Sequence, residues 1–229
     1  MLLTALCATL LLHAQQPRMR DLFATMPDSV LPQLTRNNRL DCIDFIENGM
    51  EARVRDRMEN AVVLEVLTAA YMRLRTTEHT IFEARLLPLS GGGCVVAIVS
   101  TVELGSEDAP ASLRDSHLSL ADTAWHELSP GIAARHDAAA AASGSAPAVP
   151  FALPPVQAFL APSAVMTPDV EAAVAALTDV TSVHIALDPD VTDVTLTVQT
   201  AFLDSAQRRA VEGILQPVTL HWDGSSFTP

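Results

Sequence analysis

The sequence contains no lysine, so all 14 of its basic residues are arginine, and they are outnumbered by 27 acidic residues. The formal net charge at pH 7 is therefore −13. A protein that follows nucleic-acid phosphates needs a dense basic face, and an anionic membrane attracts clusters of basic residues. The charge balance thus argues against a nucleic acid or an anionic membrane surface as the partner.

The common catalytic patterns are also missing. The run Gly91-Gly92-Gly93 lacks the Gly-Lys-Ser/Thr that completes a phosphate-binding loop, so it predicts a hairpin turn. His126 and Glu127 are not followed by the second His of a zinc-protease helix. The Gly-x-Ser-x-Gly pattern of a serine nucleophile does not occur. We therefore predict no cofactor and no metal, no catalytic residue is identified, and enzymatic activity stays an open question.

Three acidic residues deserve a separate test as metal ligands. Asp188, Asp190 and Asp193 lie in one short segment, and three carboxylates in one loop could hold a hard cation such as calcium. The segment lacks the Gly and the distant Glu of a helix-loop-helix calcium site, and Asp with Pro is ordinary turn chemistry. A turn is therefore the favoured interpretation.

Long apolar segments are scarce, although 49% of the residues are hydrophobic. That fraction is enough for a core in one large domain or two small ones. The longest apolar run covers residues 2–12 and ends at His13, which matches the hydrophobic region of a secretory signal and is too short to span a bilayer. We predict a signal peptide over residues 1–15, no transmembrane helix, and a periplasmic or secreted protein.

Only two cysteines remain after such a signal is removed, Cys42 and Cys94. An exported protein could join them, closing a loop of about fifty residues with a gain of roughly 3–4 kcal/mol. Both cysteines stand among apolar residues, where a free thiol behaves as a small hydrophobic group. Free thiols are favoured, and a disulfide stays the alternative.

The hydrophobic pattern predicts a helical start followed by a sheet. Residues 18–50 favour helices, with Asp28 capping a short helix that ends at Leu34 and Asn38 capping the next one. A period of two then predicts five or six successive strands, of which residues 94–104 are apolar on both faces and expected at the centre of the sheet. Arg53, Arg55 and Arg57 form a basic row that we interpret as a solvated face.

A composition rich in Ala, Pro, Ser and Gly predicts a linker over residues 132–166. Order resumes with a helix capped by Thr167, then strands over 183–187 and 194–198, a helix begun by Asp204, and a strand ending at Trp222. The chain is predicted to be α+β: an antiparallel β-meander with N-terminal helices packed on one face, over 16–131, followed by a smaller αββαβ lobe over 167–229.

Short motifs along the whole mature chain are similar to one family. They include Met26-Pro27-Asp28-Ser29, Asn38-Arg39-Leu40-Asp41 and Ile43-Asp44-Phe45, then Tyr71, Val99-Ser100-Thr101, Asp115-Ser116, Trp125 and Trp222-Asp223-Gly224. In this order they resemble the domain-of-unknown-function 3256 family of exported Bacteroides-type proteins. The resemblance implies an envelope or secreted location and no established activity, so it transfers no catalytic residue.

The first of these motifs suggests one low-priority site. Asp28, Asn38, Arg39, Asp41 and Asp44 bring polar groups together in the helical segment, where a partner could bind. The competing interpretation is structural: Asp28 and Asn38 cap helices, and Arg39 pairs with Asp41 or Asp44. The structural interpretation is the stronger one.

Two function classes stay open. The favoured one is an exported, non-catalytic binding or interaction module whose partner is an unknown protein or envelope component. The alternative is a hydrolase of cell-envelope components, with its acid and base drawn from scattered Asp and His residues. Residues up to Arg114 carry 14 acids and 11 Arg, whereas those from Asp115 carry 13 acids and 3 Arg, so a cationic partner is expected at the second lobe.

Overall fold

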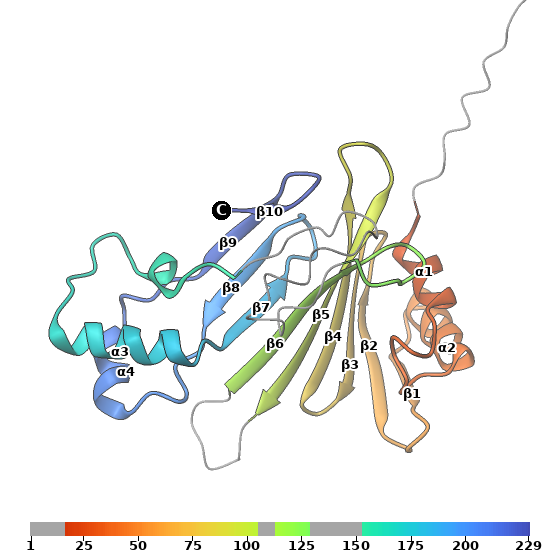
Figure 1. The fold of residues 1–229 in the computed structure, drawn as a ribbon. Helices are drawn as coiled ribbons and strands as arrows, with labels where there is room; N and C mark the ends of the chain where they lie inside the picture. The colour runs from red at the N-terminus through yellow and green to blue at the C-terminus, as the bar shows by residue number, and fades with distance from the viewer. Residues whose placement is uncertain (1–16, 105–112, 129–152) are drawn as a thin grey trace, which may run out of the picture.

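The structure, a computed structural model, describes residues 17–104, 113–128 and 153–229. The predicted signal peptide and residues 132–152 of the predicted linker lie outside these ranges. Two antiparallel sheets and four α-helices make up the described part, which confirms the α+β class (Figure 1).

The large sheet is a meander in which every strand pairs with its neighbours in sequence. Its order is β1-β2-β3-β4-β5-β6, and all five pairings are antiparallel. The strands are β1 (Ala52–Arg55), β2 (Ala61–Leu67), β3 (Tyr71–Thr77), β4 (Thr80–Pro88), β5 (Cys94–Leu104) and β6 (Leu113–Ala121). This is the predicted meander, with the turns short enough to keep consecutive strands adjacent.

Two strands are buried on both faces. In β4 every residue from Ile81 to Leu87 is buried, and in β5 the consecutive residues Val95, Val96 and Ala97 are each at most 4% exposed. β5 is the fifth of six strands and not central in the sheet, so the expectation from its apolar pattern was wrong in that respect. Its inner face is buried because the small sheet packs on it.

Helices α1 (Met19–Thr25) and α2 (Arg36–Glu47) pack at the β1 and β2 end of the large sheet, on the right in Figure 1. Thr35, not Asn38, caps α2: its side chain accepts from the Asn38 amide, and Asn38 reciprocates from the third helical position. Helix α2 ends before Gly49, which has φ +70°. Glycine adopts this left-handed conformation readily, so it suits the position just after a helix.

The predicted short helix over residues 28–34 does not form. The chain makes turns there, because Pro32 has no amide hydrogen to donate and the Asp28 carboxylate is engaged by arginines from other segments. A strand that we did not predict, β1, follows α2 and carries Arg53 and Arg55 on its exposed side. The alternation of those arginines with Ala52 and Val54 was itself a strand pattern.

The second lobe has the predicted order. Helix α3 (Pro168–Asp179), strands β7 (Val183–Leu187) and β8 (Val194–Val198), helix α4 (Ser205–Val211) and strand β9 (Val218–Trp222) follow one another. A short strand, β10 (Phe227–Thr228), adds an edge, and the sheet order is β10-β9-β8-β7.

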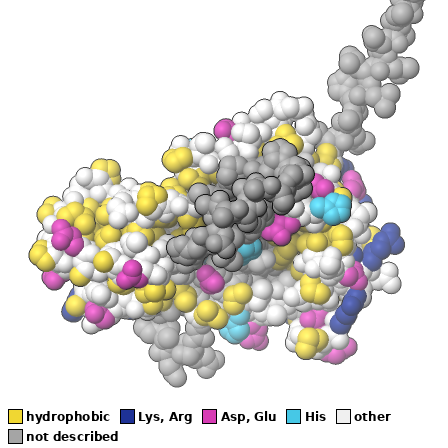
Figure 2. Space-filling model, in the orientation of Figure 1, with side chains coloured by type: hydrophobic (Ala, Val, Ile, Leu, Met, Phe, Trp, Pro, Cys, Tyr) yellow, Lys and Arg dark blue, Asp and Glu magenta, His cyan; other side chains and the backbone are white. Residues whose placement is uncertain are grey.

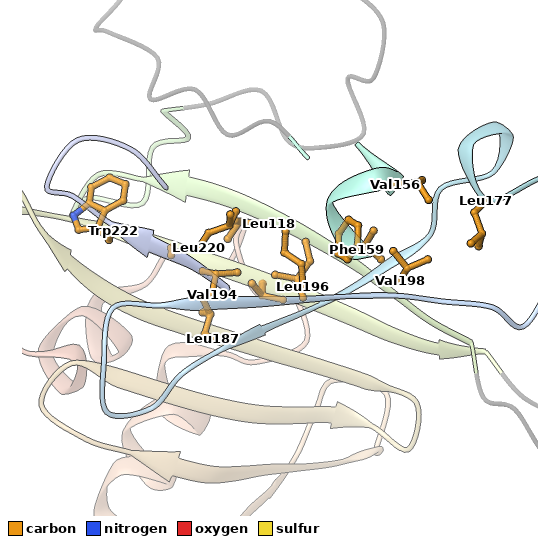
Figure 3. Close-up of a cluster of buried hydrophobic side chains, with 14 of the residues drawn as sticks. Leu118, Val156, Phe159, Leu177, Leu187, Val194, Leu196, Val198, Leu220 and Trp222 are labelled. Atoms are coloured by element: carbon orange, nitrogen blue, oxygen red, sulfur yellow. The ribbon is translucent and has the colours of Figure 1, made fainter. Parts of the chain in front are cut away.

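The two sheets share one hydrophobic core. Figure 3 shows Leu118 of β6 among Leu187, Leu196 and Leu220 of the small sheet. The 3-10 helix η1 (Val156–Phe159) adds two buried side chains to the same core, although it lies within the segment expected to be a linker. The apolar side chains of η1 anchor the part of that segment that the structure describes.

Polar contacts also join the sheets at one end. The Trp222 indole N–H donates to the Pro88 carbonyl over 2.6 Å, and the Ser90 amide donates to the Gly224 carbonyl over 3.0 Å. Gly224 has φ +95°, and a Cβ built there would lie 2.2 Å from the Ser90 hydroxyl oxygen. The turn after β9 therefore fits against the turn after β4 only with glycine at this position.

We expect Gly224→Ala to lower the free energy of unfolding by about 1–3 kcal/mol, because the new methyl group clashes with Ser90 and the backbone conformation is strained for alanine. The matched control is Gly91→Ala, since Gly91 has an ordinary φ and no atom within 4 Å of a built Cβ. Urea unfolding monitored by tryptophan fluorescence compares the two variants. Equal stabilities would contradict the proposed fit between the turns.

Candidate functional site

The residues predicted as a site are built around a buried arginine. The Arg39 side chain is 2% exposed, and its Nη1 donates to the Asp28 carboxylate over 3.1 Å and to the Leu34 carbonyl over 2.8 Å. Arg57 Nη2 donates to the second Asp28 oxygen over 2.6 Å. Asp28 thus joins two arginines from different segments and fixes the chain between α1 and α2.

The other predicted residues do not gather at this point. Asn38 is used by the cap of α2, and its amide donates to the Arg55 carbonyl on β1. Asp44 accepts from Asn48 one turn later, and Asp41 is exposed. The structure therefore brings Asp28 and Arg39 together and leaves Asn38, Asp41 and Asp44 in other contacts. The contacts of Asp28 and Arg39 hold the helical segment together. Sequence reasoning had paired Arg39 with Asp41 or Asp44, which was wrong.

A second polar cluster lies on the inner face of the large sheet, the face turned toward the small sheet. The Tyr71 hydroxyl donates to Glu83 over 2.5 Å, and Arg73 Nη1 lies 3.5 Å from the same carboxylate. Glu65 then accepts from Arg73 and Arg75, each over 2.8 Å. The cluster is continuous from the buried Glu83 to the half-exposed Glu65.

Burial dominates the electrostatics of this cluster. It raises the pKa of Glu83 above the usual 4.5, although the hydrogen bond from Tyr71 and the charge of Arg73 both act to lower that pKa. Burial, followed by the hydrogen bond to Glu83, likewise raises the pKa of the Tyr71 hydroxyl. Tyr71 is thus held as a neutral donor, and Glu83 carries its charge at a cost that Arg73 partly offsets.

A series of hydrogen-bonded side chains, two hydroxyls and one imidazole, leads from the inner face of the large sheet to the small sheet. The Thr101 and Ser116 hydroxyl oxygens are 2.9 Å apart, and the Ser116 oxygen is 3.1 Å from Nδ1 of His184 on β7. Burial, together with the nearby positive charges of Arg114 and Arg73, lowers the pKa of His184. The neutral ring is therefore favoured.

The contact between Ser116 and His184 is not a hydrolase site as it stands. A serine nucleophile needs a base that is itself oriented by a third group. No carboxylate in the described part of the chain hydrogen-bonds the His184 ring, and Thr101 beside Ser116 is only 1% exposed. The packing of β7 on β6 brings His184 to Ser116, which lies far from it in the sequence.

The acidic loop between β7 and β8 binds an arginine side chain of the same protein, Arg85. The Asp188 carboxylate accepts from the amides of Asp190 and Val191, as in an ordinary Asx turn, and these bonds lower its pKa. The Asp188 carbonyl accepts from Nη1 of Arg85, a buried residue of β4, over 2.7 Å. Among the described residues, no group of three ligating side chains suits a metal ion.

Cys42 and Cys94 are both free in the structure. Cys42 is a fully buried residue of α2, and burial raises the pKa of its thiol to about 12. Cys94 is half-buried at the start of β5, and burial raises the pKa of its thiol as well. A protonated thiol is a poor nucleophile, so neither residue is activated for chemistry.

Three surface pockets can be described. The largest, about 500 Å³, lies beside α4 and is lined by residues that include Arg208, Arg209 and Glu212. A second, about 350 Å³, includes Arg85 and Cys94, and a third, about 200 Å³, includes the Arg20 and Glu47 ion pair, whose atoms are 2.5 Å apart. None of the three places a histidine or a second carboxylate beside an acid, so none has an acid and base pair for hydrolysis.

Comparison with known proteins gives a family and a fold. A family model described as "Protein of unknown function (DUF3256)" matches residues 9–227. No curated protein matches the chain. A solved domain of an uncharacterized protein from Porphyromonas gingivalis W83 is similar, with a TM-score of 0.67 and 20% identity over 93% of this chain and 98% of that one. This likeness shows the fold alone.

None of the helices in the described ranges has the length and apolar character needed to cross a membrane.

We expect Arg39→Met to lower the free energy of unfolding by about 2–4 kcal/mol, because it removes a buried cation and leaves the Leu34 carbonyl unpaired. Asp44→Asn, on the exposed side of the same helix, should change stability by less than about 0.5 kcal/mol. Urea unfolding measures both variants. If Arg39→Met were as stable as the parent protein, the structural role of Arg39 would be refuted.

Glu83→Gln should reveal the raised pKa as a pH dependence. A carboxyl with a raised folded pKa binds its proton more tightly in the native state, so the parent protein loses stability as pH rises from 4.5 through that raised value. Glutamine does not titrate, so the stability of the variant relative to the parent should increase across this window and then level off. Urea unfolding at a series of pH values between about 4 and 8 measures the difference. A relative stability that decreases with pH would mean that Tyr71 and Arg73 outweigh burial.

Proposed function

Because the chain belongs to the DUF3256 family, whose proteins are of unknown function, we propose a function from its own geometry. The protein is an exported, non-catalytic interaction module that acts in the periplasm or after secretion. It binds a partner protein through the outer face of β5 and β6, the face turned away from the small sheet. The observation that carries this proposal is the exposure of apolar side chains at one end of that face.

The outer face of the large sheet is only partly covered. Helices α1 and α2 pack over β1 and β2, and residues near Trp125 close the top of β5 and β6. Further along β5, Val102 is 39% exposed and Leu104 is 53% exposed. Antiparallel strands that face solvent normally alternate apolar residues inside with polar residues outside, so exposed Val and Leu on an outer face are unusual there.

The neighbouring side chains give this surface a polar margin. Asp115 of β6 is paired in register with Val102, and His117 is paired with Ser100. An apolar surface bordered by polar groups is typical of a protein contact. Neither Val102 nor Leu104 lines any of the three described pockets, which favours a partner protein over a small envelope molecule. Asp115 adds a negative charge that suits a basic residue of the partner.

The alternative, a hydrolase of envelope components, has weaker support. The pockets described above lack a paired acid and base, and the contact between Ser116 and His184 lacks an orienting carboxylate among the described residues. Export is supported by the apolar run over residues 2–12, which has the length of a signal hydrophobic region.

Site-specific photocrosslinking in the cells that produce the protein tests the proposal. A photoreactive residue at Leu104 should give one discrete crosslinked product, identified by mass spectrometry, in the periplasmic or secreted fraction. Val102→Glu should reduce that product at least about fivefold, because it places a charge in an apolar contact. The melting temperature of Val102→Glu should match that of the parent, since Val102 is a surface residue.

Met58 provides the matched control position, because it is 81% exposed and lies in the turn between β1 and β2. The same product from a probe at Met58, or an undiminished product in Val102→Glu, would refute this interaction surface.

A further inference from the structure

The largest of the three described pockets lies in the second lobe, away from the outer face of β5 and β6. It has a volume of about 500 Å³, within the range of small-molecule sites. Its lining comes from the end of β8, the segment after it, helix α4 and the turn that follows, namely Val198, Thr200, Ser205, Arg208, Arg209, Val211, Glu212, Gly213 and Leu215.

The pocket has an apolar side. Val198 and Val211 belong to the shared hydrophobic core and are 8% and 1% exposed, so the pocket reaches toward that core. Leu215 packs against the same core and is half-buried. An apolar group that enters the pocket would exchange water for these side chains, which is favourable by about 25 cal/mol for each Å² buried.

The pocket is also lined by two arginines, Arg208 and Arg209. Residues from Asp115 onward contain three basic residues, Arg135, Arg208 and Arg209, and Arg135 lies outside the described ranges. The other two both line this pocket. Figure 2 agrees with this distribution: basic side chains gather on the right, over β1 and α2, and appear again at the lower left, near α4, whereas acidic side chains are scattered.

These two arginines are not neutralised by ion pairs within the described part of the chain. Nη2 of Arg208 donates to the carbonyls of Ala201 and Leu203, over 3.2 and 3.0 Å, which anchors the guanidinium at the pocket. Its buried Nε has no partner there. Arg209 is exposed and pairs with none of the described residues. Glu212 is the one carboxylate in the lining, so the formal charge of the pocket is positive.

We propose that this pocket binds a small amphipathic anion, a molecule with an apolar chain and a carboxylate head. The chain lies against Val198, Val211 and Leu215, and the carboxylate pairs with Arg209 and with the free side of the Arg208 guanidinium. Guanidinium groups suit this role because their planar fork matches the two oxygens of a carboxylate. The acidic remainder of the lobe repels anions that do not reach these two groups.

Calorimetric titration of the protein with decanoate, below the concentration at which it forms micelles, tests the proposal. We expect saturable binding of one decanoate. Octanoate, which is two methylenes shorter, should bind roughly fifteenfold more weakly, since each buried methylene contributes about 0.8 kcal/mol. Decanol, with the same chain and no charge, should bind at least about fivefold more weakly than decanoate.

Three charge variants test whether decanoate binds at this pocket or elsewhere on the protein. Arg209→Gln should weaken decanoate binding about five- to tenfold, because it removes an exposed cation without touching the core. Glu212→Gln should strengthen binding several-fold, because it removes the one negative charge of the lining. Arg36→Gln should leave binding unchanged, because Arg36 is an exposed residue of α2, and Figure 1 shows α2 and α4 at opposite sides of the molecule. Equal melting temperatures establish that the variants fold.

A phospholipid with an anionic headgroup is also an amphipathic anion. Vesicles therefore form the second part of the experiment. Binding to phosphatidylglycerol vesicles without binding of decanoate would overturn the proposal. So would the absence of saturable decanoate binding, equal affinity for decanol, or equal affinities of the Arg209→Gln and Glu212→Gln variants. These outcomes are independent of the crosslinking at Leu104, which concerns another surface.

Discussion

The central constraint in this structure is that the large sheet must be covered on both faces. Strands β4 and β5 present apolar side chains in both directions, and a single layer of helices cannot bury both sets. Helices α1 and α2 with residues near Trp125 cover one side, and the small sheet covers the other. The shared core makes the second lobe a structural part of the first, because its removal would expose Leu87, Val99 and Leu118.

Arginine supplies the polar contacts that this arrangement needs. Arg39, Arg85 and Arg208 each donate to a backbone carbonyl that is not part of regular secondary structure. A guanidinium can reach such a carbonyl and still bind a second group through its other nitrogens, which a lysine ammonium does with less geometric definition. A chain without lysine can therefore place its cations deep in the fold, as Arg39 and Arg85 show. The cost of burying them is offset by Asp28 in one case and by the acidic loop near Asp188 in the other.

The proposed functions follow from what this packing leaves uncovered. The helices reach only part of the outer face, so Val102 and Leu104 stay exposed, and the small lobe closes around its core but leaves a pocket at α4. The two surfaces differ in chemistry, since one presents exposed apolar side chains and the other is a pocket lined by two arginines. A module with these two surfaces could bind its partner and a small anion independently, because no described contact joins Arg209 to β5.

Periodicity in the sequence determined the order and type of nearly all elements, because strand alternation and helix caps are local properties. The pattern over 183–187 and 194–198 and the cap at Thr167 appear in the structure as predicted. The predictions failed where the contacts of a residue come from segments far away in the sequence. Asp28 does not cap a helix because Arg39 and Arg57 reach it from elsewhere, and the neighbours of His184 depend on how β7 packs on β6. The candidate surfaces are likewise tertiary, since whether Val102 is covered and whether Arg208 and Arg209 face a pocket depend on contacts between segments far apart in the chain.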